Sequence, residues 1–150
     1  MSAQKQKGFT LIELLVVISI IAILSVIGLV AYTTFLKNVR NAKRQSDLKL
    51  IQSALEEYHA DQHYYPSGTT LGSSITDGKT PLKTYLTTVP KDPDQSTYSY
   101  VARPASPPYD CDNTATKPCT SYCLSVSMEG TPPTSECTAA SGNNYGVTRP

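Results

Sequence analysis

The sequence predicts an α+β protein, with one long N-terminal helix followed by a small β-rich head. An uncharged, apolar run occupies residues 14–36, and the chain contains no proline before Pro66. Beyond Pro66 the composition shifts to Tyr, Pro, Ser, Thr and Gly, and all four cysteines lie in the last 40 residues. Residues 63–150 therefore have room for one small domain.

The apolar run is long enough to cross a membrane as a helix. It has 23 residues without a charge, and about 20 suffice to cross hydrocarbon about 30 Å thick. Glu13 lies at the start of this run, and an unpaired carboxylate costs roughly 2.5–3.5 kcal/mol at the bilayer centre and less near the interface. We expect either a cation partner for Glu13 or, in an ordinary signal anchor, a place among the lipid headgroups.

The residues in front of the run are typical of a short leader. They carry Lys5 and Lys7 and end in Gly8, directly before Phe9. A conventional secretory signal is cut after its apolar core, whereas here the small residue precedes the core. A cut after Gly8 would keep the helix and create a new α-amine on Phe9, four residues from Glu13. The predicted segments are a leader at 1–8, a helix at 9–62 whose residues 14–36 form the membrane-spanning or filament-core part, and a head at 63–150.

Two stretches resemble known families. KGFTLIELLVVISIIAIL, from Lys7 to Leu24, resembles the class III signal of the type IV pilin superfamily. YLTTVPKDP at 85–93, followed by YSY, resembles the G-type major pseudopilins of type II secretion and their pilin relatives, although Asp94-Gln95 stand where those proteins usually have Trp-Gly. The resemblance implies a type IV pilin-like α+β fold, cleavage after Gly8 by a prepilin peptidase and methylation of the new N-terminus.

The second half of the helix is predicted to be amphipathic. Its apolar residues recur at spacings of three, four, seven and eight: Leu36, Val39, Leu50, Ile51, Ala54, Leu55 and Tyr58. Polar residues fall elsewhere on the helix: Lys37, Arg44, Lys49, Glu56 and Glu57. We expect the apolar stripe to pack on the head, and the wholly apolar first half to be stable only in lipid or against copies of itself.

The rest of the head is predicted to be a small antiparallel sheet with Pro-rich loops. We expect a short helical turn at 81–86, strands at 98–103 and 122–128 where apolar and polar residues alternate, a weak third strand at 136–140 and a loosely held tail at 141–150. One face of each strand should cover the helix.

The clustered cysteines indicate two disulfides in an exported head. They are Cys111, Cys119, Cys123 and Cys137. A zinc site is the alternative, but the spacings lack the paired C-x2–4-C pattern. Because Gly130 lies seven residues from both Cys123 and Cys137, a hairpin centred on it would place those two opposite one another. This symmetry favours the pairs Cys111–Cys119 and Cys123–Cys137.

No pattern of catalytic residues is present, and we expect neither an enzyme nor a cofactor. His59 and His63 are spaced i, i+4, but without the glutamate of a zinc-protease helix they are interpreted as a solvated pair. Asp110, Asp112 and Asn113 offer oxygen ligands. The resemblance to pseudopilins leaves calcium open there, with a solvated acidic turn as the alternative.

Basic residues gather directly after the apolar run, although the net charge of the chain is only +1. They are Lys37, Arg40, Lys43 and Arg44. A DNA-binding stripe is one interpretation, but no aromatic residues are interleaved for base stacking, so we favour contacts with lipid headgroups or other subunits and expect no sequence-specific nucleic acid. The positive-inside rule would place the head in the cytoplasm, whereas the cysteines and the leader indicate an extracytoplasmic head.

Two classes of function remain. The first is a structural subunit of a type IV pilus-like filament, whose partners are a membrane, a prepilin peptidase, an assembly machinery and copies of itself. Such a subunit is a single-pass precursor in the bacterial cytoplasmic membrane and then part of an extracytoplasmic or cell-surface filament, either a pilus or the pseudopilus of a type II secretion system. The second is a membrane-anchored binding protein that does not polymerise.

Overall fold

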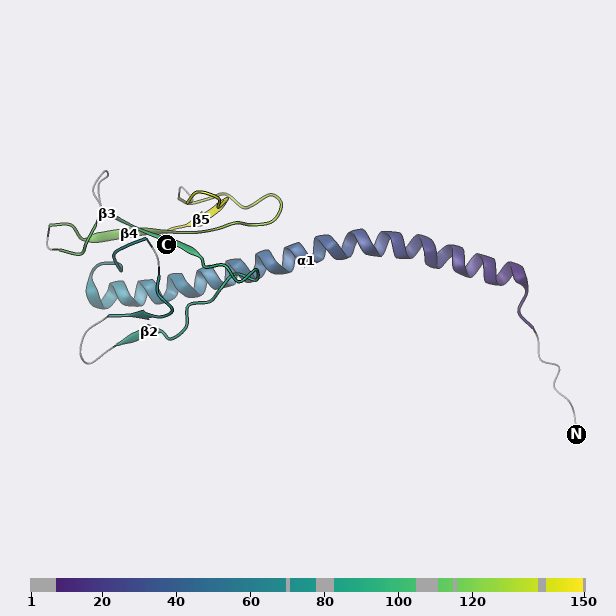
Figure 1. The fold of residues 1–150 in the computed structure, drawn as a ribbon, viewed down its shortest axis with the longest axis horizontal. Coiled ribbons are helices and arrows are strands. Elements are labelled where there is room, and N and C mark those ends of the chain that lie inside the picture. The colour runs from purple at the N-terminus through teal and green to yellow at the C-terminus, as the bar shows by residue number, and fades with distance from the viewer. Residues whose placement is uncertain are drawn as a thin grey trace, which may run out of the picture. The chain divides into compact units, whose positions relative to one another are not determined.

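The computed structural model of the chain describes residues 8–69, 71–77, 83–104, 111–114, 116–137 and 140–149. Its elements are α1 (Leu11–Gln62), β1 (Ile75–Thr76), β2 (Thr84–Leu86), β3 (Ser99–Pro104), β4 (Cys119–Val126) and β5 (Tyr145–Val147) (Figure 1). β1 and β2 form an antiparallel pair, and β3, β4 and β5 form an antiparallel sheet in that order. The predicted α+β class is confirmed. Contacts divide the chain into two units, residues 1–37 and 38–150.

The described part of the first unit consists mainly of the N-terminal part of α1. This stretch is apolar and long enough to cross a membrane by length and composition, and its large side chains are exposed, for example Leu24 at 62%. Its two serine hydroxyls donate to the carbonyl oxygens of Leu15 and Ile21, one turn back, at 2.7 Å. These polar groups are therefore satisfied within the helix, as a lipid environment requires.

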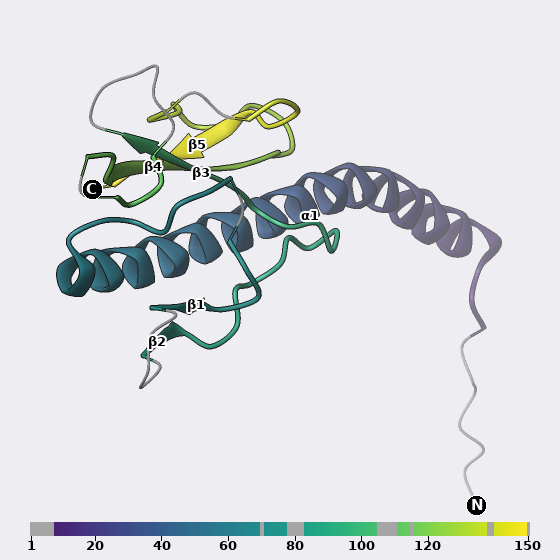
Figure 2. The ribbon, with the colours of Figure 1, turned by 60° about the vertical axis from the view of Figure 1, so that its left-hand side comes forward.

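The second unit has a core built from α1 and both sheets. The three-stranded sheet and the β1–β2 pair lie along different sides of the C-terminal part of α1 (Figure 2). The helix contributes Leu48, Ile51, Ala54, Leu55 and Tyr58, and the strands and adjoining loops contribute Tyr65, Ile75, Tyr98, Tyr100, Tyr122, Leu124, Val126 and Val147. Tyrosines supply much of this core, and Tyr65 and Tyr122 meet edge to face with ring centroids 4.8 Å apart.

The helix differs from its prediction at its start and on its buried face. It begins at Leu11, two residues after the predicted start, and ends at Gln62. The predicted stripe is wrong at Val39 and Leu50, which are 47% and 49% exposed. Arg44, predicted to lie away from the core, is buried because it has an anionic partner in the head.

The predicted helical turn at 81–86 is wrong. Residues 84–86 form β2, which pairs with β1 through Ile75 and Leu86, while Pro81 and Leu82 lie outside the described residues. The Tyr85 ring lies 5.2 Å from that of Tyr58 on α1. Packing on the helix therefore favours an extended conformation here.

The third strand also lies elsewhere than predicted. β4 pairs with β3 and with β5 at 145–147. Among the described residues of 136–140, which are 136, 137 and 140, none pairs with β4, so the described part of the chain does not form the expected hairpin centred on Gly130. The tail is not loosely held: Val147 is buried, and the Thr148 hydroxyl donates to the Tyr122 carbonyl at 2.7 Å. Glu136 reaches the same sheet through its backbone N–H, which donates to the Gly146 carbonyl at 2.8 Å.

Both disulfides have the pairing predicted from the sequence. Cys111 is joined to Cys119 and Cys123 to Cys137, with Cα separations of 5.1 Å and 6.0 Å. The second bond arises because residues 135–137 run beside β5, where the Glu136 N–H donates to the Gly146 carbonyl. A Cβ at Gly146 would lie 3.0 Å from Cys137 Sγ, so glycine permits this close approach.

β4 is buried on both faces, whereas one buried face was predicted. Tyr122, Leu124 and Val126 face the core, and Cys123 and Ser125 are also buried. The Ser125 hydroxyl oxygen accepts the Ala140 N–H at 3.1 Å and the Asn143 side-chain N–H at 3.0 Å. Ala140 and Asn143 therefore lie on the outer face of the sheet at Ser125.

Candidate functional site

The N-terminus of α1 carries a capping box. Glu13 Oε2 accepts hydrogen bonds from the Thr10 backbone N–H at 3.0 Å and the Thr10 hydroxyl at 2.8 Å, and the Glu13 N–H donates to Thr10 Oγ1 at 3.3 Å. Glu13 thus has a partner within its own chain. Our sequence analysis missed Thr10, although the spacing T-x-x-E is a known signature of a helix start.

Gly8 and Phe9 lie directly before this capping box. Phe9 is 82% exposed, and a Cβ placed on Gly8 would meet no atom within 4 Å. The described chain therefore makes no packing demand for glycine at position 8. A requirement for glycine at position 8 would have to come from another protein that binds the backbone so closely that a Cβ atom would clash.

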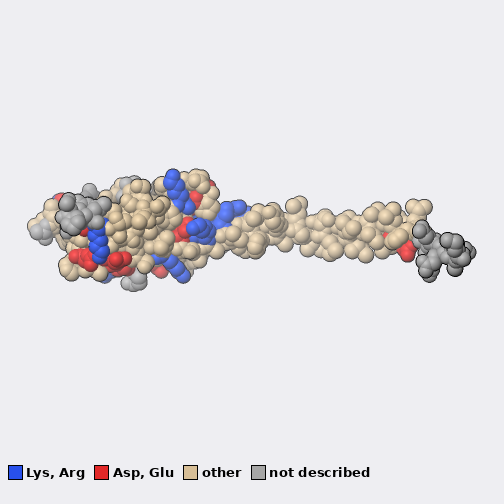
Figure 3. Space-filling view, turned by 90° about the horizontal axis from the view of Figure 1, so that it is seen from below, with Lys and Arg blue, Asp and Glu red and all other residues tan. Residues whose placement is uncertain are grey.

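Behind Glu13 the helix surface is free of charge as far as Lys37. Figure 3 shows this stretch in tan, without charged side chains on the face in view, and the Lys, Arg, Asp and Glu side chains that follow it lie on the second unit. Such an apolar surface needs lipid or other apolar helices as its surroundings.

In the second unit, α1 is tied to two loops by a group that we name the helix clamp: Arg40, Asn41, Arg44, Asp92 and Glu129. At its centre Arg44 donates to both oxygens of Asp92, at 2.7 Å and 2.9 Å. The two side chains are 5% and 2% exposed. The aspartate of the VPKDP stretch is therefore the partner of a helix arginine, and this ion pair raises the pKa of Arg44.

Glu129 joins a second loop to the helix clamp. Its carboxylate accepts from Arg40 at 2.5 Å and 2.6 Å and from Arg44 at 3.3 Å. Asn41 donates to the Glu129 carbonyl at 2.8 Å and accepts the Glu129 N–H at 3.0 Å. The interpretation as a lipid-facing or subunit-facing residue is wrong for Arg44, which is buried. Arg40 pairs with Glu129 but is 39% exposed, so its contact with lipid or with another subunit stays a prediction.

The helix clamp makes the head sensitive to acid. Arg40 lowers the pKa of Glu129 from its ordinary value of 4.5 to about 2, and the hydrogen bonds between the two side chains are the largest cause. A lowered pKa contributes stability that is fully present above pH 4.5 and is lost as the pH falls towards 2. We expect the thermal unfolding midpoint of the full chain in detergent to fall over this range, and to fall less for Glu129→Gln. Equal acid sensitivity of the two proteins would contradict this assignment.

Residues of the candidate histidine and calcium sites make contacts with other parts of the head. His59 stacks on Tyr65 with ring centroids 4.6 Å apart, and His63 lies just past the helix end with a φ of 65°. Asn113 donates to the Tyr65 carbonyl and accepts the Cys119 N–H.

Asp112 Oδ1 accepts from both the backbone N–H and the hydroxyl of Thr114, while Asp110 lies outside the described residues. Because its side-chain amide is engaged at both ends, Asn113 does not fit the role of a calcium ligand. Within the described ranges, no group of three or more His, Cys, Asp or Glu residues could hold a metal ion.

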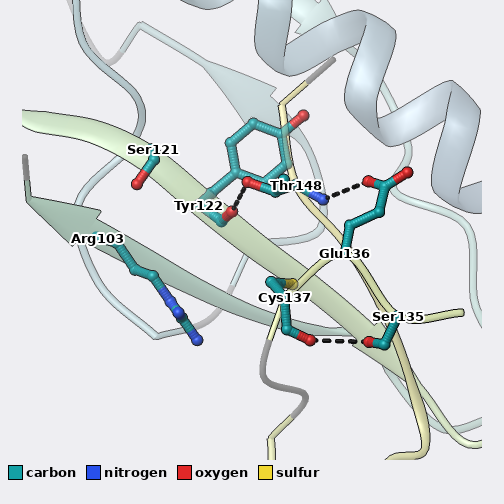
Figure 4. Close-up of a pocket in the computed structure, with 7 residues that line it drawn as sticks. All are labelled: Arg103, Ser121, Tyr122, Ser135, Glu136, Cys137 and Thr148. Carbon is teal, nitrogen blue, oxygen red and sulfur yellow. Dashed lines mark hydrogen bonds between the residues drawn. The ribbon is translucent and has the colours of Figure 1, made fainter.

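A polar hollow of about 580 Å³ lies beside the second disulfide. Its lining is Arg103, Ser121, Tyr122, Ser135, Glu136, Cys137 and Thr148 (Figure 4). Glu136 accepts the Thr148 N–H at 3.1 Å, and the Ser135 hydroxyl donates to the Cys137 carbonyl at 2.8 Å. These bonds hold the C-terminal segment against the sheet. The Ser135 hydroxyl donates to a backbone carbonyl and not to a side-chain base, so it is not arranged as an activated nucleophile.

Two family models match the chain. Residues 3–29 match the prokaryotic N-terminal methylation motif, and residues 32–114 match type II secretion system protein G. The second match covers 83 of the 150 residues. No curated protein and no solved structure gives a match. The two matched regions include the stretches whose resemblance was found in the sequence.

Proposed function

This chain belongs to the type II secretion system protein G family and is a structural subunit of the pilin and pseudopilin class, and we propose that it polymerises through α1 once residues 1–8 are removed. The observation that carries the proposal is the exposed apolar surface of the helix, most of which lies within the residues that match the methylation motif. In an isolated subunit only lipid can cover this surface. In a filament the helices of other copies cover it instead.

We propose that a prepilin peptidase cuts between Gly8 and Phe9. Both residues lie outside the helix and are exposed, so the bond is open to an enzyme. Removing residues 1–8 would leave the capping box intact, because its two residues lie beyond the cut. The mature chain would then begin at Phe9, two residues before α1 (Leu11–Gln62), and continue into the head at 63–150.

Replacing Gly8 with valine should leave nearly all of the chain at the precursor mass, because a β-branched side chain next to the scissile bond obstructs the peptidase. Gly28→Val is the matched control: Gly28 also has no atom within 4 Å of its Cβ position, and this variant should be cut normally. Intact-mass spectrometry of the membrane fraction measures both. Normal processing of Gly8→Val would overturn the proposed cleavage site.

The new Phe9 amine gives Glu13 its role in assembly. A positive amine near a helix N-terminus is unfavourable, and a carboxylate at the third helix position offsets it. In a filament of staggered helices, the Glu13 carboxylate of an arriving subunit meets the Phe9 amine of a subunit already placed. At a separation of about 4 Å and an effective dielectric near 20, the attraction is roughly 4 kcal/mol before desolvation is subtracted. A helix in the wrong register leaves Glu13 without this partner, which selects the correct stagger.

The proposed location follows from the same features. The precursor spans the cytoplasmic membrane once, its head lies on the outer side where disulfides form, and the mature subunit joins an extracytoplasmic filament. Its partners are the peptidase, an assembly machinery in the membrane and copies of itself.

Shearing of intact cells tests polymerisation. Recovery of the protein in a filament fraction supports a surface pilus, and recovery only after the cell envelope is opened supports a secretion pseudopilus. If all of the protein stays in the membrane fraction as single subunits, the chain is an anchored binding protein and the proposal fails.

A further inference from the structure

A hollow of about 480 Å³ lies in the head unit, between its part of α1 and the loop that follows β4. Its lining combines three side-chain amides, a hydroxyl and apolar groups: Asn38, Asn41, Ala42, Gln45, Met128, Thr131, Pro132 and Pro133. None of these residues carries a charge, and the volume is within the roughly 300–1,000 Å³ of small-molecule sites. We name this hollow the amide hollow. It suits a small ligand with both polar and apolar parts.

Three polar side chains of the amide hollow have hydrogen-bonding groups to spare. Asn41 is bonded to the backbone of Glu129 at both ends of its amide. The side chains of Asn38, Gln45 and Thr131, by contrast, make no hydrogen bond with the part of the chain that the structure describes. Amides and hydroxyls both donate and accept, so the hollow offers free donors and free acceptors side by side.

The amide hollow begins close to the end of the apolar run. Asn38 follows Leu36, the last residue of that run, by two positions, and two residues span at most about 7 Å. The headgroup layer on each side of the hydrocarbon is about 5–7 Å thick. When residues 14–36 span a membrane, the end of the hollow at Asn38 therefore lies at or next to the depth of the headgroups.

We propose that the amide hollow binds the headgroup of phosphatidylglycerol while the subunit is in the membrane. This inference rests on the proposed function, in which residues 14–36 span the membrane before assembly. The free amides and the Thr131 hydroxyl donate to the phosphate oxygens and accept from the hydroxyls of the terminal glycerol. Ala42, Pro132 and Pro133 contact the apolar carbon atoms beside the phosphate.

The charges around the amide hollow favour glycerol over ethanolamine as the headgroup. Glu129 follows Met128 in the loop, but its carboxylate already accepts from Arg40 and Arg44, so it does not attract an ammonium group. Lys37, directly before Asn38, is exposed and has no acidic partner among the described residues. Exposed basic residues near a membrane surface attract anionic lipids, and phosphatidylglycerol carries a net negative charge.

Native mass spectrometry of the full chain released from lipid nanodiscs tests the proposal. The discs contain equal parts of phosphatidylglycerol and phosphatidylethanolamine, and the mass of the released protein shows which lipid it retains. We expect the wild-type chain to retain one molecule of phosphatidylglycerol. In Asn38→Leu/Gln45→Leu, which replaces both free amides, the retained fraction should fall by about tenfold, which corresponds to about 1.4 kcal/mol.

Two control variants separate the amide hollow from general effects. Ser53→Leu adds a leucine at an exposed position of α1 outside the hollow, and so controls for the added apolar surface. Lys91→Gln removes an exposed positive charge elsewhere on the head, and so controls for long-range attraction to anionic lipid. Both variants should retain phosphatidylglycerol at the wild-type level.

Thr131→Val tests the opposite wall of the amide hollow without a change in α1. Valine keeps the shape of the side chain and removes its hydroxyl, so the retained fraction should fall by about threefold, as for the loss of one hydrogen bond. The unfolding midpoint of each hollow variant in detergent should stay at the wild-type value, because none of the three side chains belongs to the core.

Equal retention of the two lipids by the wild-type chain would overturn the proposal, and so would unchanged retention of phosphatidylglycerol in both hollow variants. Carbonate extraction of wild-type membranes separates these results from a failure of the proposed function. A chain that resists carbonate but retains no phosphatidylglycerol would overturn the headgroup site alone. A chain that carbonate releases would overturn the membrane-spanning precursor as well.

Discussion

Replacing Asp92 with alanine is expected to lower the free energy of unfolding of the head by about 3–5 kcal/mol, which is the usual cost of removing one partner of a buried ion pair. The Arg44 side chain is 5% exposed, and its guanidinium donates two hydrogen bonds to Asp92. Without the aspartate this charge stays buried with only Glu129 and Asn41 as partners. Urea unfolding of the full chain in detergent, followed by circular dichroism, measures the loss.

Two controls separate this effect from a general disturbance of the loop. Asp94→Ala removes an exposed carboxylate two residues away, which accepts the Ser96 N–H, and should change stability much less. The double variant Arg44→Met/Asp92→Leu removes both charges and should recover most of the lost stability. A double variant no more stable than Asp92→Ala would show that packing of the loop, and not the unpaired charge, causes the loss.

Glu13→Ala is expected to reduce filament yield by about tenfold or more, since a net pairing free energy of only 1.4 kcal/mol corresponds to that factor. We expect membrane insertion, cleavage after Gly8 and the unfolding midpoint of the head to stay at wild-type values. Glu13 lies in the first unit, and among the described residues its carboxylate accepts hydrogen bonds from Thr10. Sheared-filament yield, normalised to membrane content, gives the result.

Glu13→Gln distinguishes the two roles that the structure gives this residue. A glutamine can still accept from Thr10 and so keeps the capping box, but it has no charge for the Phe9 amine of a neighbour. We expect it to assemble as poorly as Glu13→Ala. Filaments at wild-type yield from Glu13→Gln would reject the charge pair and leave helix capping as the role of Glu13.

The parts of the fold that could be predicted from the sequence are those set by local patterns. The uncharged run and the absence of proline predict α1, and its end at Gln62 follows from the approach to Pro66. The cysteine pairing was also predicted correctly, but for a partly wrong reason. Cys137 is brought to Cys123 by the chain that runs beside β5, and not by a hairpin centred on Gly130.

The parts that could not be predicted depend on contacts far apart in the chain. Arg44 looks like one member of an exposed basic cluster until Asp92, 48 residues later, is placed beside it. β5 is only three residues long and too short to show a strand pattern. In the same way, Leu50 fits an apolar stripe by spacing, yet the described head leaves it half exposed.

The most direct test of the whole account is intact-mass and N-terminal peptide mass spectrometry of the protein in a purified filament fraction. We expect a chain that begins at Phe9, carries a methyl group on its α-amine and retains both disulfides. Filaments built from chains that still begin at Met1, or a Phe9-initiated chain found only as single subunits in the membrane, would contradict it.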